Sequence, residues 1–491
     1  MKLNFLMVQK KIKLFYNHNS MVFNLIQNEW LQWRRNSQIK WLTGFLILIS
    51  LVALVHQLSY QSHLLDTRLK AQEDSRKEWV SQELKHPHMA AHFGNYAYKK
   101  PTALQCLDPG LSIYTGTSVY MEPHRQNDFL FSKSQESDTG LRFGWLSPAL
   151  ICQLILPLFI ILFTFNSVNG ELEKGTLQLL LAQGVSFRKV LFSKVLATFI
   201  LFESFLIPYF LLTALLSYQL FDGDLNWVSL LYLLTVYSVY CLIWCLLGVL
   251  VSAHIKKIGT AIAVLLLVWM FTNIIMPRMS ANLAENMYPL ITNYELKKGI
   301  KESIENGLDG HDPKSDRAVK IEKDLLVKYK VDSVQQLPFN FEGFIMQQSE
   351  EYSSKAYDVH FKKIFSSLEN QKKVQTWMGI VSPYILIRNL SMTACNAGLE
   401  SEIDFQTQAE NYRRTFVQNM NNDMKDNSAY NSFDTYRVNK GKYEAIADLQ
   451  IENRSLTWLL QSVFIENIWL LVWGFSLFIL MFRSRSNKIY S

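Results

Sequence analysis

The sequence predicts an all-α membrane protein with six transmembrane helices and a large, mainly helical extracytoplasmic domain formed by two insertions. The 491 residues are 49% apolar and only 19% charged, yet the mean hydropathy is only +0.04. Such an average indicates that very apolar stretches alternate with clearly polar ones. Six stretches approach the roughly 20 apolar residues that a helix needs to cross a bilayer.

The six predicted spans divide the chain into alternating apolar and polar parts. They cover residues 41–58, 146–168, 190–217, 227–252, 258–277 and 458–482. The first extracytoplasmic segment is residues 59–145 and the second is residues 278–457. On the other side we expect an N-terminal part (1–40), a connector (169–189) and a tail (483–491).

Basic residues predict the orientation of these spans. They flank the membrane mostly on one side, whereas the short turn between the third and fourth spans carries Asp222 and Asp224. Because basic residues gather on the cytoplasmic side, both termini are predicted to be cytoplasmic. This bias also accounts for the net charge of +7 without nucleic-acid binding. The basic residues are Lys10, Lys11, Lys13, Arg34, Arg35, Lys40, Lys174, Arg188, Lys189, Lys194, Lys256, Lys257, Arg483, Arg485 and Lys488.

Residues 1–40 contain a second plausible start at Met21, so the first twenty residues could be an extension that is not translated. From Met21, apolar residues at helical spacing stand beside Arg34 and Arg35. This pattern is typical of an amphipathic helix that lies on the inner leaflet. A helix that continues directly into the first span is the alternative.

The second outer segment contains apolar residues at helical spacing, with charged faces between them and loops at Asn306–Gly307 and Asp309–Gly310. Each outer segment also contains one cysteine, Cys106 and Cys395. If both lie on an oxidising side of the membrane, a disulfide between them can form. The sequence leaves this open.

The connector, residues 169–189, predicts a short and rigid surface helix. Asn169 is placed to cap it, and Glu171 and Glu173 fall in its first turn, where the exposed N–H groups favour carboxylates. Gly184 is placed to end the helix. Such a helix is suited to docking in a groove on a partner protein, although acidic residues in a first turn are also common on ordinary surface helices. Its apolar stripe is Leu177, Leu180 and Leu181.

The connector resembles a known family. Glu171-x-Glu173-x-Gly175-Thr176-Leu177, followed by Leu179-Leu180-Leu181-Ala-Gln-Gly-Val-Ser186, is similar to the coupling-helix signature of ABC-2 type permeases. Within them it is most similar to the group with domain of unknown function 3526 (DUF3526), relatives of the NosY-like copper-maturation permeases. Outer motifs resemble the same group: His92-Phe-Gly-Asn-Tyr-Ala-Tyr, Leu107-Asp108-Pro109-Gly110-Leu111, Tyr114-x-Gly116, Glu122-Pro-His124, Leu337-Pro338-x-Asn340-Phe-x-Gly343, Glu350-Glu351, Asp358-x-His360 and Arg388-x-Leu390-Ser391-Met392. One departure is Ser193-Lys194, where the motif has Gly-Lys.

The resemblance implies a permease subunit in the bacterial inner membrane. It would pair with a second permease, identical or paralogous, and with cytoplasmic ATPases that hold ATP and Mg²⁺. We expect no cofactor and no enzyme activity in this chain, which lacks the phosphate loop of an ATPase. The alternative is a protein that transmits ATP hydrolysis to its outer domain, which remodels or releases a periplasmic partner without transport. The implied coupling residues are Glu171, Glu173, Gly175, Thr176, Leu177 and Leu180.

Glu203 lies inside the third span, where a carboxylate is costly and is usually buried, partnered or functional. It could line a substrate path, or be neutral and bonded to a hydroxyl of a neighbouring helix. Glu466, near the outer end of the sixth span, is expected to reach the membrane interface.

We predict no metal site, although imidazole and carboxylate side chains gather in the first outer segment. His92, Glu122 and His124 are the residues that would form one, together with His86 and His88. Their spacing matches no standard ligand pattern, and Pro87 interrupts the first pair. Structural hydrogen bonding is therefore the expected role.

Overall fold

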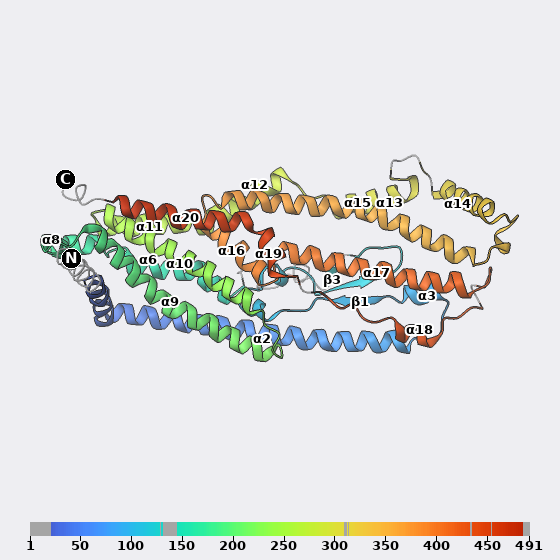
Figure 1. Cartoon of the computed structure of the whole chain (residues 1–491), viewed down its shortest axis with the longest axis horizontal. Coiled ribbons are helices and arrows are strands. Elements are labelled where there is room, and N and C mark those ends of the chain that lie inside the picture. Colours follow the sequence, from blue (N-terminus) through green and yellow to red (C-terminus); the bar gives the residue numbers. More distant parts are fainter. Residues whose placement is uncertain are drawn as a thin grey trace, which may run out of the picture.

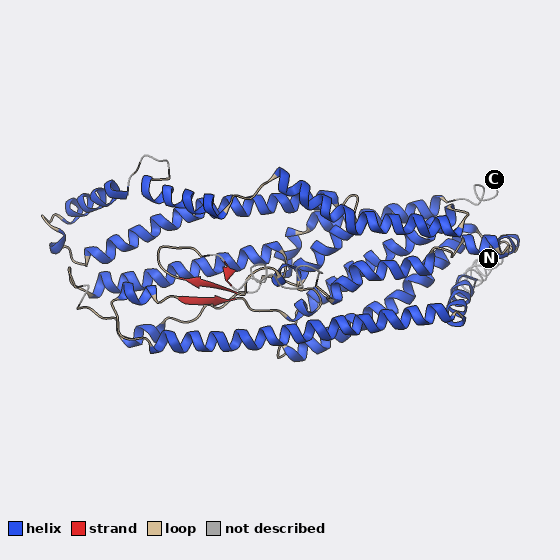
Figure 2. Cartoon of the chain, turned by 180° about the vertical axis from the view of Figure 1, so that it is seen from behind, coloured by secondary structure: helices blue, strands red, loops and turns tan. Residues whose placement is uncertain are grey.

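Long helices run side by side along an elongated molecule (Figure 1). The computed structural model describes residues 21–127, 129–130, 145–308, 312, 314–432, 435–452 and 454–484. Lys10, Lys11, Lys13, Arg485, Lys488 and the predicted Asp309–Gly310 loop lie outside these residues. The described residues are 77% helical, and the one small sheet among them stands out against the helices in Figure 2.

The prediction of six apolar helices is confirmed. Among the described residues, six helices are long and apolar enough to cross a membrane. They lie side by side in one half of the molecule, and the first of them continues into the other half (Figure 1). Their bounds are Ser37–Ser81 (α2), Pro148–Glu173 (α5 to α7), Phe187–Leu220 (α9), Trp227–His254 (α10), Ile258–Met287 (α11 and α12) and Phe464–Arg483 (α20).

The first of these helices extends far beyond the predicted span of residues 41–58. α2 is one helix of 45 residues. The stretch from Leu58 to Ser81 contains neither glycine nor proline and is rich in good helix formers, so nothing in it ends the helix. Because hydropathy reports only the apolar part, the sequence predicted less than half of α2.

Two of the apolar helices contain a π-helical turn just before a proline. The second span consists of α5 (Pro148–Leu150), a π turn at Ile151–Ile155, α6 (Leu156–Thr164) and α7 (Asn169–Glu173). The fifth consists of α11 (Ile258–Met270), a π turn at Phe271–Ile275 and α12 (Met276–Met287). Pro157 and Pro277 have no N–H to donate, and a wider turn accommodates their rings without breaking the helix.

The sixth predicted span, residues 458–482, is two helices. α19 (Leu456–Ser462) ends before Val463, and α20 (Phe464–Arg483) begins after it. α20 packs against α10 and against α16 (Pro383–Ala394).

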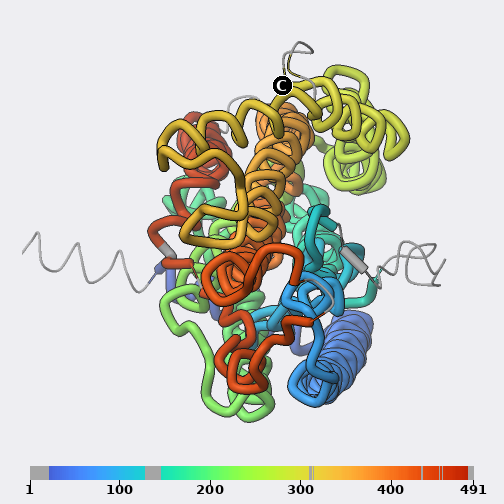
Figure 3. The backbone as a smooth tube through the Cα atoms, turned by 90° about the vertical axis from the view of Figure 1, so that its right-hand side faces the viewer, coloured from blue at the N-terminus to red at the C-terminus, as the bar shows by residue number. Residues whose placement is uncertain are grey.

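The other half of the molecule is mainly helical, with α2 along one edge and α13 along the opposite one (Figure 3). Three strands in antiparallel order β1-β2-β3, which were not predicted, lie against α17. The bounds are α3 (Pro87–His92), β1 (Asn95–Tyr98), β2 (Ser118–Met121), β3 (Phe129–Leu130), α13 (Asn293–Asn306), α14 (Lys314–Tyr329), α15 (Phe341–Met378), α17 (Leu399–Asn427) and α18 (Lys440–Ala445), with 3₁₀ turns at Ala103–Cys106, Gly110–Ile113 and Val334–Gln336.

One helix of the predicted second outer segment packs among the apolar helices. α16 (Pro383–Ala394) contacts α10, α20 and both π turns. Leu386, Ile387 and Leu390 are fully buried in the same hydrophobic cluster as the spans. The two halves of the molecule therefore share a core at this point.

Cys106 and Cys395 both belong to this shared core. They are buried, and the structure has them as free thiols. Burial in apolar surroundings raises the pKa of Cys106 to about 12, which makes its thiol a poor nucleophile.

Candidate functional site

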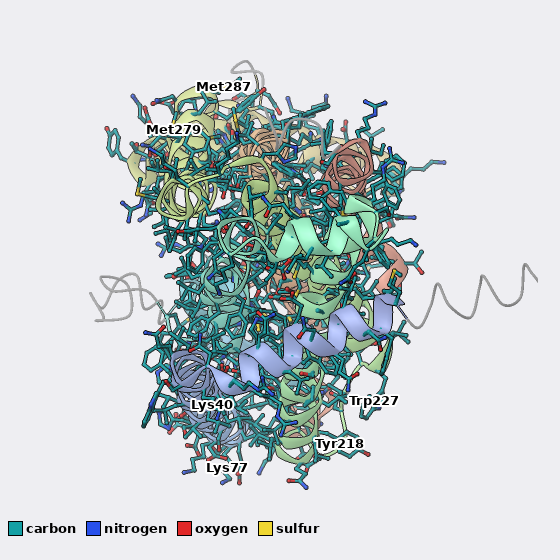
Figure 4. All side chains as sticks on the ribbon, turned by 90° about the vertical axis from the view of Figure 1, so that its left-hand side faces the viewer. Lys40, Lys77, Tyr218, Trp227, Met279 and Met287 are labelled. Carbon is teal, nitrogen blue, oxygen red and sulfur yellow. The ribbon has the colours of Figure 1, made fainter. Side chains whose placement is uncertain are left out.

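The two ends of the described chain and the connector lie at the same end of the molecule (Figure 1). Seen from that end, the helix of residues 21–35 and α8 (Thr176–Ala182) run across the ends of the long helices rather than along them (Figure 4). This arrangement covers the apolar helices with two short crosswise helices.

The connector forms two short helices, α7 and α8, rather than the single helix that its sequence predicted. Gly175 separates them with φ +74°, a left-handed conformation that favours glycine. Asn169 does not cap α7, because its amide donates to the carbonyl of Ile255 at 3.1 Å and its Oδ1 accepts from Ser252 at 3.1 Å. Gly184 follows the end of α8 with φ +83°, as expected of a glycine in that position.

The side chains of the connector divide into an inner and an outer face. Leu177 is fully buried, and Leu180 packs against the same core. Glu173, Thr176 and Leu179 are exposed, and Leu179 is 64% exposed. The outer face therefore offers a carboxylate and an apolar side chain to a partner, whereas Leu177 and Leu180 hold the connector in place.

A buried ion triad, Glu29–Lys194–Glu171, ties the connector to two other elements. Lys194 of α9 lies 2.5 Å from Oε1 of Glu29, in the helix of residues 21–35, and 2.8 Å from Oε1 of Glu171, in α7. Its side chain is only 4% exposed. Glu171, predicted as a coupling residue, thus faces the protein interior.

One ammonium group serves two carboxylates in this triad. Burial raises the pKa of Glu29, although the charge of Lys194 opposes that rise. Removing the cation would leave two carboxylates that are largely shielded from water, which is strongly destabilising in buried ion clusters. The triad is therefore a strong link between three elements that meet at this end.

Glu29 was not among the predicted residues, and Lys194 was predicted only as one of the basic residues that flank the membrane. The only signal was a lysine about two turns into an apolar helix, which needs a partner when buried. That partner stands 165 residues away in the sequence, and no local pattern identifies it.

The helix of residues 21–35 is separate from α2, as a helix that lies on the membrane surface would have to be. Asn36 lies between the two helices and caps α2, because its side chain accepts from the N–H of Gln38 at 2.9 Å. Trp30 donates to the carbonyl of Ala197 at 3.2 Å, and Trp33 packs edge-on against Phe163. The helix is therefore anchored on the protein through its tryptophans.

A buried polar cluster lies where α16 enters the core. Gln153 donates to the hydroxyl of Tyr237 at 2.7 Å, and that hydroxyl lies 2.8 Å from Oγ of Ser391. Ser391 donates in turn to Asp108, whose other oxygen accepts from the N–H of Gly110 at 3.0 Å. Burial raises the pKa of Asp108, although these hydrogen bonds oppose the rise. Asp108 and Ser391, far apart in the sequence, both belong to the resemblance motifs and meet here.

Glu203 and Glu466, the glutamates singled out in the third and sixth apolar helices, are both bonded to hydroxyl groups. Ser238 of α10 donates to Oε2 of Glu203 at 3.0 Å. Glu203 is thus bonded to a hydroxyl of a neighbouring helix, as one of its two predicted roles states. The expectation for Glu466 was wrong: it is 2% exposed and accepts from Thr376 of α15 at 2.6 Å. The hydroxyl supplies the hydrogen bond that makes this burial tolerable.

The predicted metal-site residues are only partly brought together. His92 and His124 lie with His88, and the nitrogen atoms that these three rings offer are within 4.8 Å of one another. Glu122 is not in that group, but its charge acts on His92. Burial lowers the pKa of His88 to about 4, helped by the neighbouring imidazoles.

Two family models match the chain. Residues 294–451 match DUF3526. This match confirms the part of the resemblance that named this domain, whose function is unknown. Residues 112–303 match DUF2705, a protein of unknown function. No curated protein matches the chain.

The two matches cover different parts of the molecule. The DUF3526 match spans α13 to α18, and the DUF2705 match includes the connector and the spans from α5 to α12. Each covers less than half of the chain, and neither description states an activity.

Proposed function

We propose that this chain is the membrane-spanning permease subunit of an ABC-2 type transporter, coupled through its connector to a separate cytoplasmic ATPase. In this proposal the chain pairs with a second permease in a bacterial inner membrane, with both termini in the cytoplasm. The substrate path runs between the apolar helices, and residues 59–145 and 278–457 face outward.

The observation that carries the proposal is the buried triad Glu29–Lys194–Glu171. A partner that pushes on the connector would move Glu171, and the ion pairs would pass that movement to α9 and to the helix of residues 21–35. A surface helix with no other role would not need such a link. The exposed Glu173 and Leu179 give the partner one polar and one apolar contact on the connector.

A mechanical function without transport is favoured by one separate observation. α2 runs without interruption from the connector end into the other half of the molecule. A rearrangement of the spans would therefore reach the outer part directly. Transport and mechanical action share the ATPase-coupling step, and they differ in whether a substrate crosses.

The coupling step is tested with Glu173→Lys/Leu179→Ala, which alters the exposed face of the connector and leaves the triad intact. Tagged chain is purified from native membranes, and mass spectrometry identifies co-purified proteins that contain a Gly-x-x-x-x-Gly-Lys-Ser/Thr phosphate loop. We expect such an ATPase with the wild type and at least a tenfold loss of it, and of ATP hydrolysis, with the variant, because about 1.4 kcal/mol of docking energy corresponds to a factor of ten.

Glu444→Lys/Val327→Ala is the matched control, since it removes an exposed carboxylate and an exposed apolar side chain at the opposite end. It should retain the ATPase. Equal recovery from both variants would refute the connector assignment. Flux assays in proteoliposomes then separate the two functions, because the mechanical one predicts ATP turnover without flux.

A further inference from the structure

Three histidines from two separate segments form a compact group in the half of the molecule away from the connector. The ring centroids of His88 and His92 are 4.6 Å apart, and His124 is 5.3 Å from each of them. Nε2 of His88 lies 3.1 Å from Nε2 of His92. Two nitrogens bound to one tetrahedral Zn²⁺ at roughly 2.0–2.1 Å are about 3.3 Å apart, so this spacing already suits a shared metal ion.

The backbone holds these imidazoles in place from both sides. His88 and His92 stand four residues apart on α3 and therefore share one face of the helix. His124 belongs to a turn after β2 and has φ +68°, a left-handed conformation that is uncommon outside glycine. Strain of this kind persists only where the surroundings enforce it, and it is common at binding sites.

Glu350 of α15 enforces the position of His124. Its Oε1 accepts from the backbone N–H of His124 at 2.7 Å and also pairs with Nδ1 of the same residue. With Nδ1 bound to a carboxylate, Nε2 of His124 is left to coordinate a metal ion. This carboxylate–histidine arrangement is the usual support of a metal-binding imidazole.

Glu350 is itself fixed by a buried arginine of α17. Arg413 lies 3.4 Å from Oε2 of Glu350, and its Nε donates to Glu410 at 2.7 Å. Arg413 also donates to the carbonyl of Glu122 at 3.1 Å, next to the turn that carries His124. The support therefore reaches from the histidines through α15 to α17.

We propose that His88, His92 and His124 bind a divalent transition-metal ion, with Zn²⁺ as the reference ion and Glu350 as the positioning residue of His124. Three imidazoles favour Zn²⁺, Cu²⁺ or Ni²⁺ over Mg²⁺ or Ca²⁺, which prefer oxygen ligands. His124 is 45% exposed, so the ion has access from solvent. The fourth position of a tetrahedral shell is open to water or to a ligand from a partner.

The test is a Zn²⁺ titration of the full chain, purified in detergent and stripped with a chelator. We expect about one Zn²⁺ per chain, with X-ray absorption at the zinc edge showing nitrogen neighbours at about 2.0–2.1 Å. His92→Gln and His124→Gln each remove one imidazole from a partly exposed position. Each should weaken Zn²⁺ binding by at least about 10- to 100-fold, because losing a residue that only supports a ligand already has an effect of that size. Glu350→Gln should weaken it about tenfold while the nitrogen shell persists.

His360→Ala is the matched control, because His360 lies on α15 outside the group and contacts Ser303 at 3.0 Å. It should bind Zn²⁺ like the wild type, and thermal unfolding of each stripped variant shows whether it is folded. The proposal is overturned if the wild type takes up no Zn²⁺, if the zinc shell contains oxygen only, or if a folded His92→Gln/His124→Gln variant binds as tightly as the wild type. The titration needs no ATPase, so its failure leaves the proposed coupling untouched.

Discussion

Lys194 shows how one residue decides the structure of the connector end. It stands about two turns inside α9, where a lone ammonium would be costly, and the two glutamates offset that cost. The hydropathy of the sequence revealed the helix but not its partners, because Glu29 and Glu171 come from elements that meet only in the folded chain. For the same reason the sequence did not show that Glu171 pairs with Lys194 in the protein interior.

Replacing Lys194 by methionine should strongly destabilise the chain. Two buried carboxylates would lose their cation, at a cost of about 3–5 kcal/mol. Thermal unfolding in detergent, followed by tryptophan fluorescence, measures the change.

Arg188→Ala is the control for this substitution, since Arg188 lies exposed in the first turn of the same helix. It should change stability by less than about 0.5 kcal/mol. Glu29→Gln/Lys194→Met/Glu171→Gln, which removes all three charges together, should recover most of the loss. A single Lys194→Met variant as stable as the wild type would show that these ion pairs do not hold the three elements together.

At the scale of elements, α10 packs closely against α6 at Gly248. A Cβ at this position would collide with the hydroxyl of Thr164 in α6. Gly248→Ala should therefore destabilise the chain by about 1–3 kcal/mol, the usual cost of overpacking.

Gly44→Ala in α2 provides the comparison, because a Cβ there meets nothing within 4 Å. Alanine is favoured over glycine inside a helix, so this change should be neutral or stabilising by about 0.5–1 kcal/mol. Both variants are compared by unfolding midpoints in detergent. Equal midpoints would mean that α6 and α10 do not approach as described.

Elements were predictable where a strong local pattern specifies them. Apolar runs located all six apolar helices, and Gly184 follows the end of α8 as its sequence position predicted. The π turns before Pro157 and Pro277 and the break at Val463 were not predicted, because packing decides how a helix responds to such residues. The small sheet was also missed, since four-residue strands are too short to give a clear alternation.

At the scale of the whole molecule, α8 and α14 lie at opposite ends (Figure 1). The proposed topology places the first inside the cell and the second outside it. All five cysteines are buried, so thiols introduced at exposed positions can be labelled against a low background. Leu179→Cys and Val327→Cys are suitable, since both side chains are more than half exposed.

A membrane-impermeant maleimide should label Val327→Cys in right-side-out membrane vesicles and Leu179→Cys only in inside-out vesicles. The unsubstituted chain controls for the native thiols, and detergent should make both introduced thiols reactive. Labelling of both positions from the same side would contradict the six-crossing topology.

The uninterrupted α2 has a mechanical consequence. At about 1.5 Å per residue its 45 residues measure about 67 Å. Its far end is clamped to α18, where Trp79 donates to the carbonyl of Tyr443 at 2.9 Å. Such a rod acts as a lever: pivoting about one end, a tilt of about 5° swings the other by about 6 Å. A small tilt of α2 about its near end, next to the helix of residues 21–35, would therefore move α18 by several ångströms.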